Sequence, residues 1–303
     1  MQLLTACIRN GGFRSDYETF CPAFWSVRFD REGARIPPLL IHAERCGTFE
    51  TNIGTEKIKM KQNKYDDNNF FESYGKMPRS IDGLNSAGEW YILRKMLPEF
   101  QGKNVLDLGC GYGWHCIYAK QQGAENVIGI DLSQKMIDKA KENSKDLAID
   151  YKQMAIEDIN FEPERFDVVF SSLAFHYLKE LKTVFRKINQ TLKKGGSFVF
   201  SMEHPVFTSR AEQDWFTDES GNRLHWPIDN YQDESKRESQ FLGHKVTKYH
   251  RTLETIINTV IQSNFDIREI SEPKPSEEIL KKYPEMKDEM RRPIFIMISA
   301  IKK

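Results

Sequence analysis

Three glycines stand at alternate positions in the stretch VLDLGCGYG, namely Gly109, Gly111 and Gly113. Glycine has no side chain to obstruct a sharp backbone turn or the close approach of a ligand to the main chain. A helix predicted directly afterwards would present free N–H groups at its first turn. Asp131 follows Gly111 by 20 residues, where a carboxylate can accept two hydrogen bonds from a ribose diol. The spacing predicts a nucleoside-binding loop.

The spacing of these glycines also separates two kinds of nucleoside ligand. Dinucleotide-binding loops read GxGxxG, whereas this loop reads GxGxG and has Trp114 where the third glycine would stand. Asp107, two residues before the first glycine, is poorly placed for a pyrophosphate. It is well placed for a cationic amino-acid head group, directly or through water. The pattern therefore disfavours a nicotinamide-dependent oxidoreductase.

Apolar periodicity places these residues on an alternation of strands and helices. Short apolar runs predict strands at 103–108, 126–130, 166–171, 265–270 and 294–301. Helical spacing of apolar residues predicts helices at 89–96, 114–122, 133–145, 178–192 and 253–261, the fourth of them ended by Gly195. Such alternation predicts an α/β fold with a doubly wound sheet, whose ligand sites open at the carboxyl ends of the parallel strands.

Four motifs resemble those of class I S-adenosylmethionine-dependent methyltransferases: VLDLGCGYG with Asp131, DLSQKMIDKAKEN, ERFDVVFSSLAFHYL, and LKKGGSFVFSMEHP with its Gly-Gly turn and fifth strand. The resemblance spans about Asp66 to Lys303 and is strongest to the small-molecule branch that includes ubiquinone and menaquinone methyltransferases. It implies a Rossmann-like sheet of seven strands, mostly parallel with an antiparallel C-terminal strand. It further implies S-adenosyl-L-methionine as cofactor, S-adenosyl-L-homocysteine as product, and methyl transfer by in-line displacement.

The resemblance also implies residues for the cofactor site. Leu132 would line the adenine, with core packing as the alternative. Family members often place an Asp just before the acidic pair corresponding to Glu157 and Asp158, but Ala155 stands there, so we expect the backbone of Ile156 to serve the adenine edge. Related enzymes have a lid before the first sheet strand. The expected cofactor-binding set is Tyr74, Arg79, Asp107, Gly109, Cys110, Gly111, Gly113, Asp131, Leu132, Ile156, Glu157 and Ser171.

Tyr74 and Arg79 belong to the predicted lid, residues 60–98. Tyr74 could lie on the sulfonium face, where an aromatic ring attracts a cation, and Arg79 could pair with a carboxylate. An ordinary amphipathic helix is the alternative for this segment.

Candidate catalytic residues follow the fourth and fifth strands. His176 could accept a proton from the nucleophile near neutral pH, or it could merely pack beside the cofactor. Glu203 and His204, at the end of the fifth strand, are the next candidates because sites open at that edge of a parallel sheet. Methyl transfer mainly requires a nucleophile held in line at about 3 Å in a dry pocket.

The acceptor is expected to be a small molecule. The loop from Ser171 to Tyr177 lacks the Asn/Asp-Pro-Pro-aromatic tetrad with which resembling enzymes hold a base nitrogen, and no Pro-Cys nucleophile occurs. The 44 basic and 44 acidic residues cancel, so no nucleic-acid partner is expected, although a protein or RNA acceptor stays open. An aromatic-rich insertion at 205–251 is predicted to cap the substrate, the alternative being a lid or dimer surface.

Composition sets the remaining expectations for this chain of 303 residues. No apolar run reaches membrane length, and five cysteines without a CxxC pair or zinc spacing predict neither a disulfide framework nor a metal site. We expect a cytoplasmic monomer or homodimer. All six basic residues from Met1 to Glu56 are Arg. We expect residues 1–59 to be a poorly ordered extension upstream of a natural start at Met60, with a small accessory domain as the alternative. A noncatalytic cofactor-binding sensor or scaffold is the alternative function.

Overall fold

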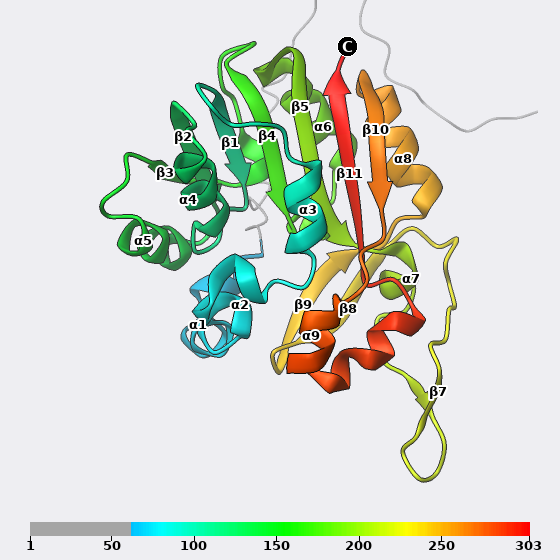
Figure 1. Ribbon diagram of the computed structural model, residues 1–303. Coiled ribbons are helices and arrows are strands. Elements are labelled where there is room, and N and C mark those ends of the chain that lie inside the picture. Colours follow the sequence, from blue (N-terminus) through cyan, green and yellow to red (C-terminus); the bar gives the residue numbers. More distant parts are fainter. Residues whose placement is uncertain (1–61) are drawn as a thin grey trace, which may run out of the picture. The chain divides into compact units, whose positions relative to one another are not determined.

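The computed structural model describes residues 62–303 and is built around a seven-stranded sheet (Figure 1). Its strands are β1 (Asn104–Leu108), β2 (Asn126–Asp131), β3 (Asp150–Gln153), β4 (Phe166–Ser172), β5 (Leu192–Glu203), β10 (Phe265–Ser271) and β11 (Phe295–Lys302). They lie in the order β10-β11-β5-β4-β1-β2-β3. The strands from β5 to β3 run parallel, whereas β11 is antiparallel to both β5 and β10. The predicted fold class is confirmed. The predicted extension, residues 1–59, lies outside the described residues.

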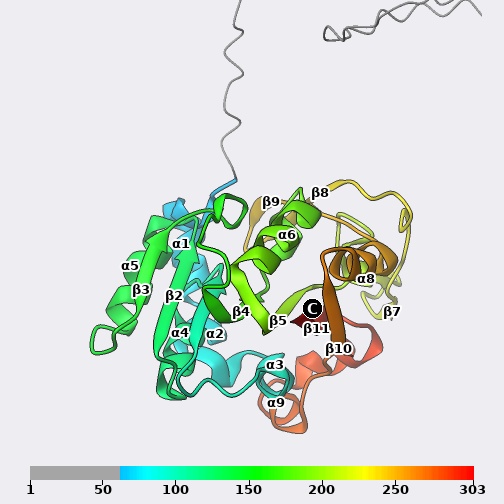
Figure 2. The ribbon, with the colours of Figure 1, turned by 90° about the horizontal axis from the view of Figure 1, so that it is seen from above.

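Helices cover both faces of the sheet, as the view from above shows (Figure 2). One face packs on α3 (Trp90–Met96), α4 (Trp114–Gln121) and α5 (Gln134–Asn143), and the other on α6 (Leu181–Thr191) and α8 (Leu253–Gln262). The alternation of side chains along a strand produces the two cores: Val105 packs with Cys116 of α4, whereas Leu106 joins Phe185 of α6. No helix within residues 62–303 is long and apolar enough for a membrane crossing.

Two further groups of elements gather at the carboxyl edge of the parallel strands (Figure 1). The N-terminal group consists of η1 (Lys64–Asp66), α1 (Asn68–Gly75), α2 (Pro78–Ile81) and η2 (Gly83–Ser86). The second group follows β5 and consists of α7 (Pro205–Thr208) and two hairpins, β6 (Phe216–Thr217) with β7 (Arg223–His225), and β8 (Lys236–Phe241) with β9 (His244–Tyr249). The short η3 (Ile156–Asp158) and η4 (Phe175–Tyr177), and then α9 (Glu277–Lys282) and η5 (Pro284–Arg291), complete the chain.

Local structure differs from the prediction around the fifth strand. The helix predicted at 178–192 begins at Leu181 and ends at Thr191, and β5 follows at once, because Leu192 is already extended and pairs with Phe166. Gly195, at φ +74°, lies inside this long strand and does not end the helix. The insertion 205–251, predicted to cap the substrate, contains α7 and both hairpins.

Candidate active site

The glycine loop joins β1 to α4 and leaves one side of its backbone open. Gly109, Gly111 and Gly113 all have positive φ angles, of 78°, 51° and 78°. A Cβ atom at Gly113 would lie 2.4 Å from the Tyr151 hydroxyl oxygen, and one at Gly109 would lie 2.7 Å from Cβ of Ala174. Around Gly111 no atom lies within 4 Å of such a Cβ position. The outer glycines are therefore required for packing, and the middle one leaves room for a ligand.

Asp131 ends β2 and is anchored against this loop. Its Oδ2 accepts the Gly111 N–H at 3.0 Å, and its Oδ1 accepts the Ser133 N–H at 2.9 Å. Burial raises the pKa of Asp131 to about 6, although these two hydrogen bonds favour the charged form. Each carboxylate oxygen keeps a lone pair beyond its backbone contact, which is the acceptor capacity that a ribose diol needs.

Asp107 lies beneath the loop and is fully buried. Its Oδ2 accepts a hydrogen bond from Cys116 Sγ at 3.2 Å, and its Oδ1 has no partner within the described chain. Burial raises the pKa of this carboxyl to about 8. A buried, unpartnered carboxylate oxygen beside a cleft fits a cationic ligand group, since a cation would offset the cost of its burial.

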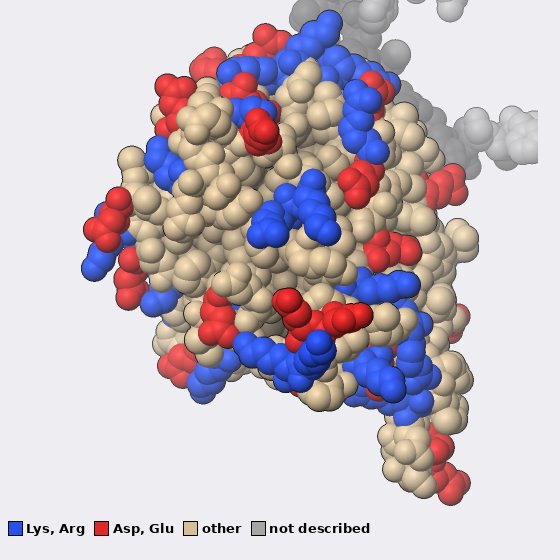
Figure 3. All heavy atoms as spheres, in the orientation of Figure 1, with Lys and Arg blue, Asp and Glu red and all other residues tan. Residues whose placement is uncertain are grey.

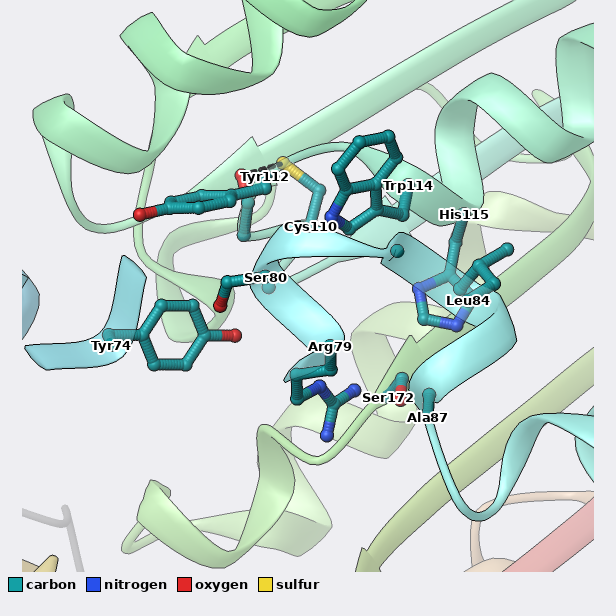
Figure 4. A pocket seen from close by; sticks show the side chains of 13 residues that line it. Tyr74, Arg79, Ser80, Leu84, Ala87, Cys110, Tyr112, Trp114, His115 and Ser172 are labelled. Atoms are coloured by element: carbon teal, nitrogen blue, oxygen red, sulfur yellow. Dashed lines mark hydrogen bonds between the residues drawn. The ribbon is translucent and has the colours of Figure 1, made fainter. Parts of the chain in front are cut away.

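A cleft opens between the loop and the N-terminal elements (Figure 4). The loop side contributes Gly109 to Tyr112 with Trp114 and His115, and β4 contributes Ser172. Tyr74, Arg79, Ser80, Gly83, Leu84 and Ala87 line the opposite side. Arg79, predicted to meet a ligand carboxylate, donates from Nη2 to Oε1 of Glu89 at 3.0 Å and keeps other N–H groups beside the cleft. Cys110 points its Sγ at the carbonyl of Gly111, at 3.9 Å (Figure 4).

The residues predicted for the adenine end follow β2, β3 and β4. Leu132 is half-buried, and its carbonyl accepts from the Gln153 side chain at 3.2 Å. Ile156 is buried at the start of η3, and the Glu157 carbonyl accepts from Lys187 Nζ at 2.6 Å. Ser171 is buried and donates to the Leu108 carbonyl at 2.7 Å, so its hydroxyl links β4 to β1. Its neighbour Ser172 lines the cleft instead.

The segment before α1 forms hydrogen bonds both to the start of α5 and to the β8–β9 hairpin. Asp66 Oδ1 accepts from the Ser133 hydroxyl at 2.5 Å and from the Lys135 N–H at 3.1 Å, at the start of α5. Gln62 pairs with the backbone of Thr247 in β9 through both its amide nitrogen, at 3.2 Å, and its amide oxygen, at 2.6 Å. We call residues 62–67 the strap.

His176 and Glu203, predicted separately from two strands, come together. The ring nitrogen Nδ1 of His176 accepts the Glu203 N–H at 3.3 Å, and Nε2 lies 3.9 Å from Glu203 Oε1. Burial lowers the pKa of His176 to about 4, although Glu203 acts in the opposite sense. His204 lies apart: its Nδ1 accepts the Val206 N–H at 3.0 Å, where it caps α7, and its Nε2 lies 2.8 Å from Glu272 Oε1.

Lys248 and Gln213 join His176 and Glu203 in one group of contacting side chains, which we call the His176 cluster. Neither Lys248 nor Gln213 is in the predicted set. Lys248 is 2% exposed, and its Nζ lies 2.6 Å from Glu203 Oε1 and 2.8 Å from the Gln213 amide oxygen. Burial would raise the pKa of Glu203, but contact with His176 and Lys248 holds it below its ordinary value. No local pattern in the sequence indicates the ion pair between Lys248 and Glu203, because Lys248 lies in a polar strand 45 residues from Glu203.

Three tyrosines connect the cleft with the His176 cluster. The ring of Tyr65 packs edge-on against Tyr74, with centroids 5.4 Å apart, and against Tyr177, with centroids 6.4 Å apart. The hydroxyl oxygens of Tyr65 and Tyr177 lie 3.4 Å apart. Tyr74 lines the cleft, and the Tyr177 ring is tilted against the His176 ring, with centroids 4.3 Å apart. A continuous aromatic wall therefore runs from the glycine loop to Glu203.

The sheet order, the glycine loop and the acid after β2 define a Rossmann-like nucleoside-binding protein. A family model described as a methyltransferase domain matches residues 106–200. A solved structure from Listeria monocytogenes, assigned as an S-adenosylmethionine dependent methyltransferase, is 54% identical with a TM-score of 0.69, covering 73% of this chain and 99% of that one. An S-adenosylmethionine dependent methyltransferase from Mesorhizobium loti is 40% identical with a TM-score of 0.68, covering 73% and 100%.

The chain belongs to the S-adenosylmethionine-dependent methyltransferases, and the predicted cofactor and enzyme class are confirmed. A more distant relative is a ubiquinone biosynthesis O-methyltransferase of Bradyrhizobium diazoefficiens. It is 33% identical over 128 residues, which is 42% of this chain and 45% of the relative. The residues of this chain fit the cofactor: the open side of Gly111, the lone pairs of Asp131 and the unpartnered Oδ1 of Asp107 suit a nucleoside with a cationic head group.

Proposed function

We propose that the chain transfers a methyl group to a small-molecule acceptor held between the aromatic wall and the β8–β9 hairpin. The observation that carries this proposal is the junction of the cofactor cleft with the His176 cluster through Tyr65, Tyr74 and Tyr177. The strap and the β8–β9 hairpin cover this junction. Gln62 bonds the strap to β9, and Lys248 of β9 pairs with Glu203 of β5. A covered, largely aromatic site suits a compact acceptor.

The charge distribution also favours a small acceptor over a polyanion. Acidic and basic side chains are interspersed over the face shown in Figure 3, and the full chain has 44 of each. Proteins that bind nucleic acid gather positive charge on one face to neutralise phosphates. On the face in Figure 3 the basic side chains that adjoin at the lower right have acidic side chains beside them, and most of the face is neither basic nor acidic.

In this proposal the residues of the cleft position the cofactor and those of the cluster position the acceptor. Asp131 and the Gly111 backbone hold the ribose, and Arg79 meets the carboxylate of the head group. When bound, the sulfonium supplies the methyl group and a good leaving group. The aromatic wall excludes water and aligns the acceptor for in-line attack.

We assign the acceptance of a proton to Glu203 and not to His176. Because Nδ1 of His176 accepts the Glu203 N–H, the neutral imidazole carries its proton on Nε2, which faces Glu203 Oε1. In this tautomer the protonated Nε2 lies on the side of the Glu203 carboxylate, 3.9 Å from Oε1, and cannot itself take a proton. His204, engaged with Val206 and Glu272, serves to cap α7.

The test supplies the enzyme and S-adenosylmethionine with an isotopically labelled methyl group to fractionated cell extracts. The proposal predicts label in a small-molecule fraction, S-adenosylhomocysteine in equal amount, and loss of both with Glu203→Gln. Label found only in protein or RNA would contradict the proposed acceptor class. Cofactor binding without any transfer would favour the sensor or scaffold.

A further inference from the structure

His115 is a buried polar side chain with unused hydrogen-bonding groups. It is the second residue of α4, is 8% exposed and lines the cleft. Its ring packs edge-on against Trp90, with centroids 5.3 Å apart, and Phe170, 5.6 Å apart. Neither ring nitrogen has a hydrogen-bond partner among residues 62–303. The ring nitrogens are not among the buried unpaired polar atoms of the described residues, so they face the cleft, where a ligand can reach them.

The surroundings keep this imidazole neutral. Burial lowers the pKa of His115 to about 3, and the nearby Arg79 guanidinium acts in the same sense. A neutral imidazole has one N–H donor and one nitrogen acceptor, so it can serve either end of a zwitterion. Figure 4 shows the ring extending from α4 toward the part of the cleft that Arg79, Leu84 and Ser172 line.

Other unused polar groups lie around the same part of the loop. Trp114 Nε1 is buried without an acceptor, and Oδ1 of Asp107 is buried without a donor. Arg79 uses one N–H group on Glu89. Arg79, Trp114 and His115 all line the cleft, and Asp107, whose carboxyl is buried, lies just before the loop in the chain. A group that carries an ammonium and a carboxylate on neighbouring atoms would satisfy both donors and acceptors.

We propose that His115 is a cofactor-binding residue that hydrogen-bonds the amino-acid head group of S-adenosylmethionine and, with Arg79, makes this end of the cleft selective for that group. Packing alone does not require a histidine, because a phenylalanine would make the same edge-on contacts with Trp90 and Phe170 but would present no hydrogen-bonding group to the cleft.

The test compares two ligands that share the adenosine and sulfur but differ in the head group: S-adenosylhomocysteine and 5′-methylthioadenosine. Calorimetric titration of the full chain gives both affinities for the wild type, His115→Phe and His115→Asn. For His115→Phe we expect S-adenosylhomocysteine to bind about ten-fold or more weakly, and 5′-methylthioadenosine to bind within two-fold of the wild type, since hydrogen bonds to charged groups are lost only with the first ligand. His115→Asn, which keeps a donor and an acceptor, should recover part of the loss.

Equal weakening for both ligands would assign His115 to packing and overturn the proposal, as would unchanged affinity for S-adenosylhomocysteine. His225→Phe, at an exposed position in β7, is the matched control. If His115→Phe does not fold, His115→Ala takes its place, and the measured quantity is again the ratio of the affinities for S-adenosylhomocysteine and 5′-methylthioadenosine. The inference rests on the cofactor and not on the proposed acceptor, so failure to find labelled product leaves both affinities, and this test, unaffected.

Discussion

Two buried aspartates beside the glycine loop lie in different electrostatic surroundings. Asp131 receives two backbone N–H groups, whereas Asp107 receives only the weak Sγ donor of Cys116. Burial raises the pKa of both, to about 6 and about 8 respectively. A carboxylate that already has strong donors is a stable acceptor for hydroxyl groups. One without them gains most from a cationic ligand, so the two acids suit opposite ends of the cofactor.

The raised pKa of Asp107 predicts how stability depends on pH. In the unfolded chain an Asp releases its proton near pH 4. The folded chain retains this proton up to about pH 8, so between these values unfolding releases a proton and stability falls as pH rises. Asp107→Asn should remove this contribution. Urea denaturation at pH 5 to 8 should show a wild-type slope more negative than that of the variant by up to about 1.4 kcal/mol per pH unit; parallel profiles would show that Asp107 is already ionised in the folded state.

At the scale of elements, the strap holds the start of α5 through Asp66. Asp66→Ala removes the acceptor of the Lys135 N–H and of the Ser133 hydroxyl. Losses of this capping kind cost about 0.5 to 2 kcal/mol, and we expect faster amide hydrogen exchange at the start of α5 and in residues 62–67. Mass spectrometry of deuterium uptake measures this.

Asp67→Ala is the matched control for that variant. Asp67 caps α1 by accepting the Phe70 N–H at 3.0 Å. Its loss should speed exchange in α1 and leave α5 unchanged. The same exchange pattern in both variants would mean that Asp66 has no separate role at α5.

The β8–β9 hairpin is held to the sheet by a buried ion pair. Lys248→Met leaves the Glu203 carboxylate buried without its cation, which costs about 3 to 5 kcal/mol when a buried pair is broken. Adding Glu203→Gln should restore part of the stability, because the unpaired charge is then gone. Urea denaturation measures both variants, with Lys245→Met at an exposed position of β9 as control. A loss no greater than that of the control would show that the pair does not hold the hairpin.

Features that depend on residues close together in the sequence could be predicted, whereas features that depend on contacts between distant residues could not. The glycine loop and Asp131 could be predicted because their spacing is local and glycine has few substitutes where φ is positive. The end of α6 could not be predicted in the same way. Leu192 pairs with Phe166, so β5 begins before Gly195, the residue predicted to end the helix. Lys248 and Gln213 meet Glu203 only through the insertion, and the unpaired nitrogens of His115 depend on neighbours from α3 and β4.

At the scale of the molecule, one edge of the sheet brings all the proposed chemistry together. The parallel strands β1, β2, β4 and β5 end at the glycine loop, Asp131, Ser172 and Glu203. The N-terminal elements and the β8–β9 hairpin cover that edge from two sides, and the strap joins them. The family motif residues lie on the cofactor side. The proposed acceptor side is built mainly by the strap and the insertion, which would explain why the motifs indicate the cofactor more sharply than the acceptor.

The central claim is that the cofactor lies along the glycine loop and presents its sulfur to the aromatic wall. The most direct measurement is a crystal structure of the full chain with S-adenosylhomocysteine. We predict ribose hydroxyls on the Asp131 carboxylate, the head group near Arg79, and the sulfur facing the Tyr65–Tyr177 side of the cleft. A nucleoside bound elsewhere, or a sulfur directed away from these tyrosines, would contradict the account.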